Sequence, residues 1–424
     1  FTSLLFPPFF LIPLGFVIFP YLLYLLNSKK NVLSYKSHFF SGFFYGLGFF
    51  SIFLLWLREP FFLEESTKNY AWFFYLLILY CSIYFGFIFF IIKFFKKALL
   101  KLLMLPLLII LSEFLCANFS FGFPWFSFAL INSNNLIGNT LIFYLGSLGL
   151  SLITIFIFLF PYLFLLKDQK DKKLLFLIYM LTFLLVLLLF FLNKLNHNIK
   201  ESNLNMKESN LISITIAQLN YPINQYLNLD EKKIKIEEIN KIIKNSKSEI
   251  IIFAENEFPY LMNNESINYF QSILNNNQKL IIGSTRKEFL KYYNSLFLIT
   301  RNNYQKFDKE ILVPFGEFIP FRHLFNFMEF IAGEQDFTKG SDLRHIKIQK
   351  NFSIMPVICY EIIYFFRLMD HNDTNMIVNL TNDAWFGSLL GPYQHFYFTK
   401  LRAAEFNKPI IRVSTNGISA ILGS

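Results

Sequence analysis

Long apolar runs dominate the first half of the chain and stop near residue 195. Six of them are long enough to cross a hydrocarbon core, which takes roughly 20 helical residues. They lie at about 4–26, 38–57, 70–92, 98–117, 141–166 and 174–192. The pattern therefore predicts a multi-span α-helical membrane bundle over residues 1–195.

The second half has a different pattern, in which short apolar runs alternate with polar stretches. Residues 196–210 are rich in Asn, Lys, Glu and Ser, which is typical of a linker. A helical pattern covers Asp230 to Lys244, and KLIIGSTR is expected to end as a strand at Gly283. The strand-like runs are LISITIAQL, EIIIFAENE, KLIIGSTR, NSLFLIT, SIMPVIC and MIVNLTND. This alternation predicts a layered α/β domain over residues 211–424, with polar strand ends on one rim.

The composition agrees with a membrane protein, because 54% of the residues are hydrophobic and only 16% are charged. A formal net charge of +10 could indicate a nucleic-acid partner. However, the lysines of the first half cluster in short loops between apolar runs, where topology signals lie. We therefore expect the membrane, and no nucleic acid, as a partner.

Basic loops alternate strictly with loops that are not basic. The first, third and fifth loops are rich in lysine, the second has more acids than bases, and the fourth, 118–140, carries no charge. Cytoplasmic loops are enriched in Lys and Arg. The polar half, which follows the sixth run, is therefore expected on the periplasmic face of a bacterial inner membrane.

Two polar or aromatic features of the membrane half have alternative interpretations. Trp125 lies in the uncharged stretch FSFGFPWFSF. It is interpreted either as an anchor at headgroup level or as part of a lipid-facing lip of an active site. Glu113 is the only acid within an expected span. It is either a functional intramembrane group or a structural hydrogen-bond partner of a neighbouring helix.

Only one of the three cysteines stands apart. Cys81 and Cys116 lie in long apolar runs, where a thiol behaves as a small hydrophobic group. Cys359 ends the strand SIMPVIC and is followed by Tyr360 and Glu361. The three cysteines make no disulfide framework, and the six histidines lack ligand spacing, so no metal is expected.

A strand-end cysteine is usually a core residue, so a nucleophile must be argued from its partners. It needs a base for its proton and a group that stabilises the oxyanion formed on attack at a carbonyl. Glu255 ends the strand IIIFAE, and Lys309 lies just before ILVPFGEF. We predict Glu255 as general base, with Lys309 and the backbone N–H of Tyr360 beside the developing negative charge of an adduct on Cys359.

The order Glu, Lys, Cys, with CYE around the thiol, resembles the nitrilase superfamily. Together with LVPFGEFIP, ICYEII, LTNDAWFG and the membrane half, it resembles the apolipoprotein N-acyltransferases of that superfamily. The resemblance implies a transmembrane bundle joined to an αββα nitrilase-like sandwich, without a cofactor. The catalytic and supporting residues that it implies are Glu255, Lys309, Cys359, Glu317, Tyr360 and Glu361.

The resemblance also implies substrate contacts. Asn382, Asp383 and Trp385 would shape the pocket, although a structural turn at a strand end explains them almost as well. Tyr226 lies near the place where the family usually has a tryptophan, and Trp125 would line the lip. The family normally has eight spans, so its first and last spans are expected to be missing from this chain, with the catalytic domain incomplete at its C-terminal end.

The implied reaction is a two-step transfer through a thioester on Cys359. The sn-1 acyl chain of a phospholipid, typically phosphatidylethanolamine, would pass to the α-amine of the diacylglyceryl-cysteine of an apolipoprotein, the last step of bacterial lipoprotein maturation. One alternative is a membrane-tethered nitrilase-type amidohydrolase, in which water resolves the acyl-enzyme. Another is a transporter or lipid-binding protein, which predicts polar residues grouped at mid-depth of the membrane.

Overall fold

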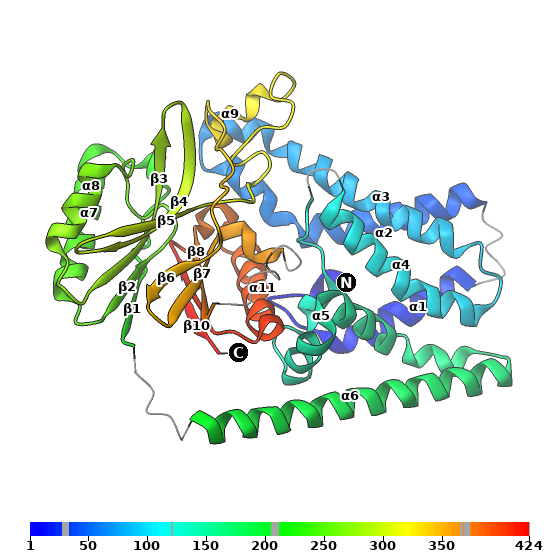
Figure 1. Cartoon of the computed structure of the whole chain (residues 1–424). Coiled ribbons are helices and arrows are strands. Elements are labelled where there is room, and N and C mark those ends of the chain that lie inside the picture. The colour runs from blue at the N-terminus through cyan, green and yellow to red at the C-terminus, as the bar shows by residue number, and fades with distance from the viewer. Residues whose placement is uncertain (28–33, 120–121, 205–211, 365–367, 369–373, 424) are drawn as a thin grey trace. The chain divides into compact units, whose positions relative to one another are not determined.

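The computed structural model describes residues 1–424 except 28–33, 120–121, 205–211, 365–367, 369–373 and 424 (Figure 1). The chain divides into two compact units, which we call the helical unit and the α/β unit. The helical unit comprises Phe1–Arg58, Asn69–Glu208 and Leu389–Glu405. The α/β unit comprises Glu59–Lys68, Ser209–Ser388 and Phe406–Ser424. Segment 59–68 of the first half thus belongs to the α/β unit, and segment 389–405 of the second half belongs to the helical unit.

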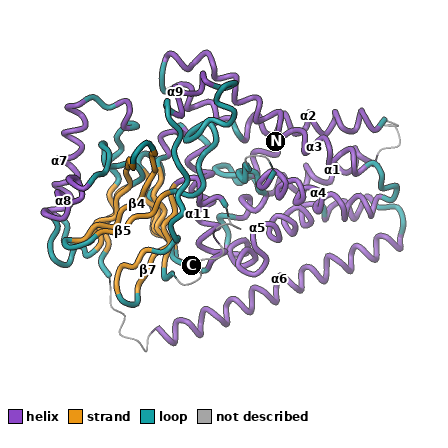
Figure 2. The backbone as a smooth tube through the Cα atoms, turned by 45° about the horizontal axis from the view of Figure 1, so that its top comes forward, coloured by secondary structure: helices purple, strands orange, loops and turns teal. Residues whose placement is uncertain are grey.

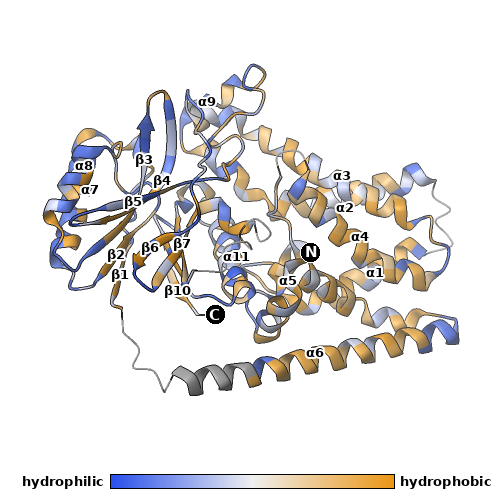
Figure 3. Cartoon of the chain, viewed as in Figure 1, coloured by the Kyte–Doolittle hydropathy of each residue, from blue (hydrophilic) through white to orange (hydrophobic). Residues whose placement is uncertain are grey.

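The helical unit consists mainly of long apolar helices, which are coloured as hydrophobic in Figure 3. The helices of this unit are α1 (Gly15–Asn27), α2 (Tyr35–Phe53), α3 (Phe74–Ile92), α4 (Ala98–Asn118), α5 (Leu136–Phe158) and α6 (Gln169–Leu204), together with the less apolar α11 (Gly391–Phe406) from the second half. Among the described residues, four helices are long and apolar enough to span a membrane, or five if α2 and the bent segment Leu55–Phe62 count as one span. These are helices of a multi-pass membrane protein.

The apolar run at 4–26 is not a single membrane-spanning helix, which agrees with the alternative that its prolines divide it into separate helical pieces. Residues 2–5 and 12–14 form 3₁₀ turns, and α1 has only 13 residues. Pro7, Pro8 and Pro13 explain the interruption, because proline removes a backbone donor and clashes with the preceding turn. The expected six spans are therefore four or five in the part of the chain that the structure describes.

The expected linker at 196–210 is also wrong in part. Helix α6 continues to Leu204 without a break, so the first residues of that stretch are helical. The remainder, 205–210, lies outside the described residues.

Among its described residues, the α/β unit contains two five-stranded sheets. The first has the order β1-β2-β3-β4-β5 and the second the order β10-β9-β8-β7-β6. The strands β1, β2 and β3 are parallel, as are β7, β8 and β9, and the outer pairs are antiparallel. The strands are β1 (Ile214–Ala217), β2 (Ile250–Phe253), β3 (Lys279–Glu288), β4 (Lys291–Thr300), β5 (Tyr304–Asp308), β6 (Ile346–Gln349), β7 (Phe352–Ile358), β8 (Met376–Thr381), β9 (Ile410–Ser414) and β10 (Ala420–Leu422).

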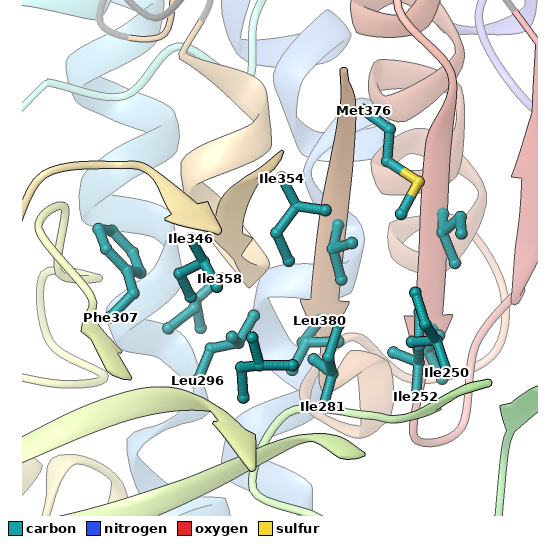
Figure 4. Packing of buried hydrophobic residues seen from close by; sticks show 14 of the residues in the cluster. Ile250, Ile252, Ile281, Leu296, Phe307, Ile346, Ile354, Ile358, Met376 and Leu380 are labelled. Carbon is teal, nitrogen blue, oxygen red and sulfur yellow. The ribbon is translucent and has the colours of Figure 1, made fainter. Parts of the chain in front are cut away.

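The two sheets pack face to face through a single apolar core, which Figure 4 shows at close range. Ile250 and Ile252 of β2 point into this core, whereas Ile251 and Phe253 lie on the other face of the same strand. That other face is covered by helices α7 (Leu229–Asn245) and α8 (Asn264–Ile273), as Figure 2 also shows; α9 (Glu329–Ala332) lies in a connection. The predicted combination of a helical membrane region with a layered α/β domain is confirmed.

Candidate active site

Cys359 opens the turn that directly follows β7. Its backbone lies in the left-handed region, with φ of 49°, which is strained for a residue with a side chain. The thiol is buried. Burial and the charge of Glu255 raise the pKa of Cys359, although Lys309 acts in the opposite direction. The resting residue is therefore a neutral thiol, which needs a base before it can attack a carbonyl.

Glu255 lies two residues beyond the end of β2, on a turn that passes close to β3. A Cβ atom on Gly283 would lie 2.6 Å from the Cα atom of Glu255 and 2.7 Å from the carbonyl oxygen of Ala254. Gly283 therefore does not end its strand, as the sequence led us to expect, because β3 continues to Glu288. It instead leaves the space that the Glu255 turn occupies.

The Glu255 carboxylate interacts with the thiol and with an amide. Its charge acts on Cys359, and its Oε1 accepts a hydrogen bond from Asn294 Nδ2 at 2.7 Å. Burial raises the pKa of Glu255, Lys309 lowers it, and the neighbouring Glu317 raises it again. The net rise makes this carboxylate a stronger proton acceptor than an exposed glutamate.

Lys309 follows β5 and points between two carboxylates. Its Nζ atom lies 3.0 Å from Glu317 Oε1 and 3.6 Å from Glu255 Oε1. Burial alone would lower the pKa of Lys309, but Glu317 and Glu255 raise it above the ordinary value, so the side chain stays an ammonium. Glu317 is held in turn by the backbone N–H of Val313, 2.9 Å from its Oε2.

Glu361 is a buried carboxylate that joins the cysteine turn to the lysine segment. Its Oε2 accepts a hydrogen bond from the N–H of Ile358 at 2.8 Å. Its Oε1 accepts from the N–H of Glu310 at 2.9 Å, one residue after Lys309. Arg344 pairs with it at 2.6 Å. Glu361 thus fixes backbone on both sides of the site and is itself fully buried.

Tyr360, the other predicted supporting residue, is also buried. Its ring lies 5.4 Å from that of Tyr364, whose hydroxyl donates to the Tyr360 hydroxyl at 3.4 Å. The side chain is therefore part of the packing beneath the turn. The contribution of its backbone N–H to an oxyanion site stays a prediction.

The stretch around Asn382 and Asp383 is held mainly by internal contacts. Asn382 caps the following 3₁₀ turn through the N–H of Ala384. Asp383 is fully buried and pairs with Arg412 at 2.6 Å. The charge of Asp383 and a hydrogen bond from Thr381 both act on the pKa of Cys359, so this strand end lies beside the candidate nucleophile. Trp385 is half-buried. Substrate contact by these residues stays a prediction.

Tyr226 lies in the 3₁₀ turn Asn224–Tyr226 and is half-buried. Burial raises its pKa, and the charge of Glu64 contributes in the same direction. Glu64 belongs to segment 59–68, whose Glu59 occupies the space that a Cβ on Gly387 would need. This segment of the first half therefore lies near two of the stretches where substrate contacts are predicted.

Trp125 belongs to the core of the helical unit. Its side chain has no exposed surface, and its Nε1 donates to Gln394 Oε1 at 2.7 Å. The interpretation as a headgroup anchor is therefore wrong, and the substrate contact stays a prediction. Glu113 accepts hydrogen bonds from the N–H of Phe128 at 2.8 Å and from Ser151 Oγ at 2.9 Å. These contacts favour its structural interpretation.

Sequence reasoning did not identify two residues that lie at this site. Asn294 is the first residue of the predicted strand NSLFLIT and Thr381 lies in LTND, but neither is predicted as a site residue. The latter motif could have pointed to Thr381, whereas no signal along the chain marks Asn294. Within the described residues, no group of three or more His, Cys, Asp or Glu side chains is arranged to hold a metal ion.

Two family models match the chain, the first over most of the helical membrane region and the second over the α/β domain. "Apolipoprotein N-acyltransferase N-terminal domain" matches residues 1–159. "Carbon-nitrogen hydrolase" matches residues 213–424, half of the chain. The chain belongs to the apolipoprotein N-acyltransferase family of the nitrilase superfamily.

Curated relatives agree with this assignment. The apolipoprotein N-acyltransferase of Rhizobium leguminosarum bv. trifolii is 35% identical over 192 residues, 42% of this chain and 36% of the relative. That of Rickettsia typhi is 40% identical over 134 residues, 31% of this chain and 27% of the relative. That of Rhodopseudomonas palustris is 25% identical over 454 residues, 99% of this chain and 83% of the relative. The chain thus spans about a third of the Rhizobium relative's length in that match.

Proposed function

We propose that the protein transfers the sn-1 acyl chain of a phospholipid, with phosphatidylethanolamine as the expected donor, to the N-terminal α-amine of diacylglyceryl-cysteine in apolipoproteins. The observation that carries the proposal is the buried cluster of Cys359, Glu255 and Lys309, in which the charge of Glu255 acts on the thiol and Lys309 Nζ lies 3.6 Å from the Glu255 carboxylate. This arrangement suits attack of sulfur on an ester carbonyl.

In the first half-reaction, Glu255 accepts the thiol proton as Cys359 Sγ attacks the ester carbonyl carbon. Lys309 and the N–H of Tyr360 stabilise the oxyanion. The tetrahedral adduct collapses when the C–O bond breaks, and Glu255 returns the proton to the departing lysophospholipid oxygen. The product is a thioester on Cys359.

In the second half-reaction, the α-amine of the acceptor attacks the thioester and gives a proton to Glu255. The C–S bond breaks, the thiolate takes that proton back, and an amide is released. The lysine-rich loops support a location of the catalytic unit on the periplasmic face of the inner membrane, where both lipid-anchored substrates lie.

A trapped acyl-enzyme tests the proposal. Phosphatidylethanolamine with a labelled sn-1 chain should label the purified protein in a hydroxylamine-sensitive manner, and Cys359→Ala should abolish the label. A diacylglyceryl lipopeptide with a free amine should then take up the label. Labelling that survives in Cys359→Ala would contradict the mechanism. Removal of the label by water but never by the lipopeptide would instead establish the amidohydrolase.

A further inference from the structure

Asn294 is a buried amide of β4 that contacts two carboxylates at once. Its Nδ2 donates to Glu255 Oε1 at 2.7 Å and to Glu317 Oε1 at 2.8 Å. Its backbone carbonyl also accepts the N–H of Lys309 at 2.8 Å. One residue thus touches the candidate base, its neighbouring carboxylate and the lysine between them.

The orientation of the amide follows from these contacts. Both N–H groups point to carboxylates, and a flipped amide would place its oxygen against two negative charges. The Asn294 Oδ1 atom is buried, without a hydrogen-bond partner among the described residues. A buried acceptor without a partner is costly, so the contacts on the nitrogen side must outweigh that cost.

We propose that Asn294 is a positioning residue that keeps Glu255 ionised and aimed at Cys359 while Glu317 lies close by. Only a neutral double donor can join the two carboxylates without adding charge. Strand β4 is paired on both sides, with β3 and β5, which makes it a rigid support for this side chain. The inference rests on the proposed roles of Glu255 and Cys359.

The charged and titratable groups that face Glu255 are Lys309, Glu317 and Cys359. Burial raises the pKa of Glu255, and the hydrogen bond from Asn294 acts against that rise. Without Asn294, the base should take up its proton at a higher pH. Base-assisted reaction of Cys359 should then lose its rate at a higher pH as well.

The test is the pH profile of Cys359 alkylation by iodoacetamide in the full chain, followed by peptide mass spectrometry. In Asn294→Ala the midpoint of the acid limb should rise by about one pH unit. In the isosteric Asn294→Asp it should rise further, because a third carboxylate joins the cluster. The reagent is not a phospholipid, so the result is independent of whether acyl transfer occurs.

The matched control is Gln278→Ala. Gln278 is another buried amide, which donates to the carbonyl of Ser246 and accepts from the N–H of Asn275. Its loss should lower stability without moving the midpoint. An unchanged midpoint in folded Asn294→Ala or Asn294→Asp, or an equal shift in Gln278→Ala, would overturn the inference.

Discussion

The ion pair of Glu361 with Arg344 shows how single buried side chains hold the site together. Both side chains are fully buried, and the carboxylate also binds backbone N–H groups beside Cys359 and Lys309. Removing one partner of such a pair leaves an uncompensated buried charge. We expect Glu361→Gln to lower the free energy of unfolding by about 3 to 5 kcal/mol. Thermal unfolding in detergent would measure the loss.

The pH dependence of this loss follows from the pKa of Glu361. Burial alone would raise that pKa, but Arg344 and the N–H of Ile358 hold it below its usual range. The stabilisation is therefore fully present above the ordinary glutamate pKa and is lost as pH falls through the lower folded value. The difference in the free energy of unfolding between wild type and Glu361→Gln should be largest at pH 7 and should decrease to zero in acid. A gap that widens in acid would contradict this prediction.

Glu310→Gln is the control for Glu361→Gln. Glu310 pairs with the same Arg344 at 2.8 Å but is partly exposed. Solvent screens such a pair, so its loss should cost less than about 1 kcal/mol. Equal losses for the two variants would show that burial is not the cause.

The site residues themselves were predictable to different degrees. Glu255 and Cys359 come directly after apolar strands, so the chain itself indicates that they lie at a sheet edge. Asn294 lies within a strand, and its importance depends on Glu255 and Glu317, which reach it from other segments. A pattern along one segment cannot show such a meeting point.

At the scale of elements, the strands with the longest apolar runs were predicted and short ones were missed, among them β9, whose five residues are all buried but include Arg412. All four residues of β2 are buried, and so are all six of β8. By contrast, β5 reads YQKFD and β6 alternates buried and exposed positions over only four residues. Such short segments form strands because they pair with a neighbouring strand. This pairing cannot be predicted from the β propensity of the segment alone.

Helix α11 was not predicted, and its buried face explains why. That face includes Gln394, His395, Thr399 and Arg402, so it lacks the apolar period of an amphipathic helix. Gln394 connects α11 to other segments of the helical unit through hydrogen bonds instead of apolar contacts. Its Oε1 accepts from Trp125 and from Trp56, and its Nε2 donates to the carbonyl of Phe53 at 3.0 Å.

Gln394→Leu should therefore destabilise the helical unit strongly. It removes the acceptor that Gln394 provides to two indole N–H groups and the donor that it provides to one carbonyl, at about 1 to 3 kcal/mol each. We expect a lower thermal midpoint and a red-shifted tryptophan emission, since two of the four tryptophans are affected. The exposed neighbour Tyr393 provides the control, and Tyr393→Leu should change neither quantity. Equal melting of the two variants would contradict the role given to Gln394.

At the scale of the whole molecule, surface chemistry distinguishes the two units. Helix α6 buries only 11% of its apolar membrane window inside the protein, so its leucines and phenylalanines are exposed nearly all round. Exposing such an apolar surface to water is energetically unfavourable, whereas exposing it to the hydrocarbon core of a membrane is not. The lysines of the loops, which contribute to the net charge of +10, are expected to determine the orientation of the helices in the membrane.

The loop charges predict which parts of the chain an impermeant reagent can reach. In a background without native cysteines, Ser66→Cys and Asn303→Cys should react with a membrane-impermeant maleimide in cells whose outer membrane is permeabilised. Lys97→Cys and Lys173→Cys should react only after the inner membrane is opened. All four positions are exposed in the protein, so burial cannot account for a difference.

The control for this topology experiment is denaturation in detergent, after which all four cysteines should react equally. Reaction of Lys97→Cys in unopened cells would contradict the orientation, because the lysine-rich third loop would then lie outside. Ser66 and Asn303 both belong to the α/β unit, so protection of both cysteines would place this unit in the cytoplasm. It would then be separated from the lipoproteins that the proposal places at the outer face, and the proposed acyl transfer would be contradicted together with the topology. The labelling experiment, which tests the orientation predicted from the lysines, therefore also tests the proposed function, as the Cys359→Ala variant does.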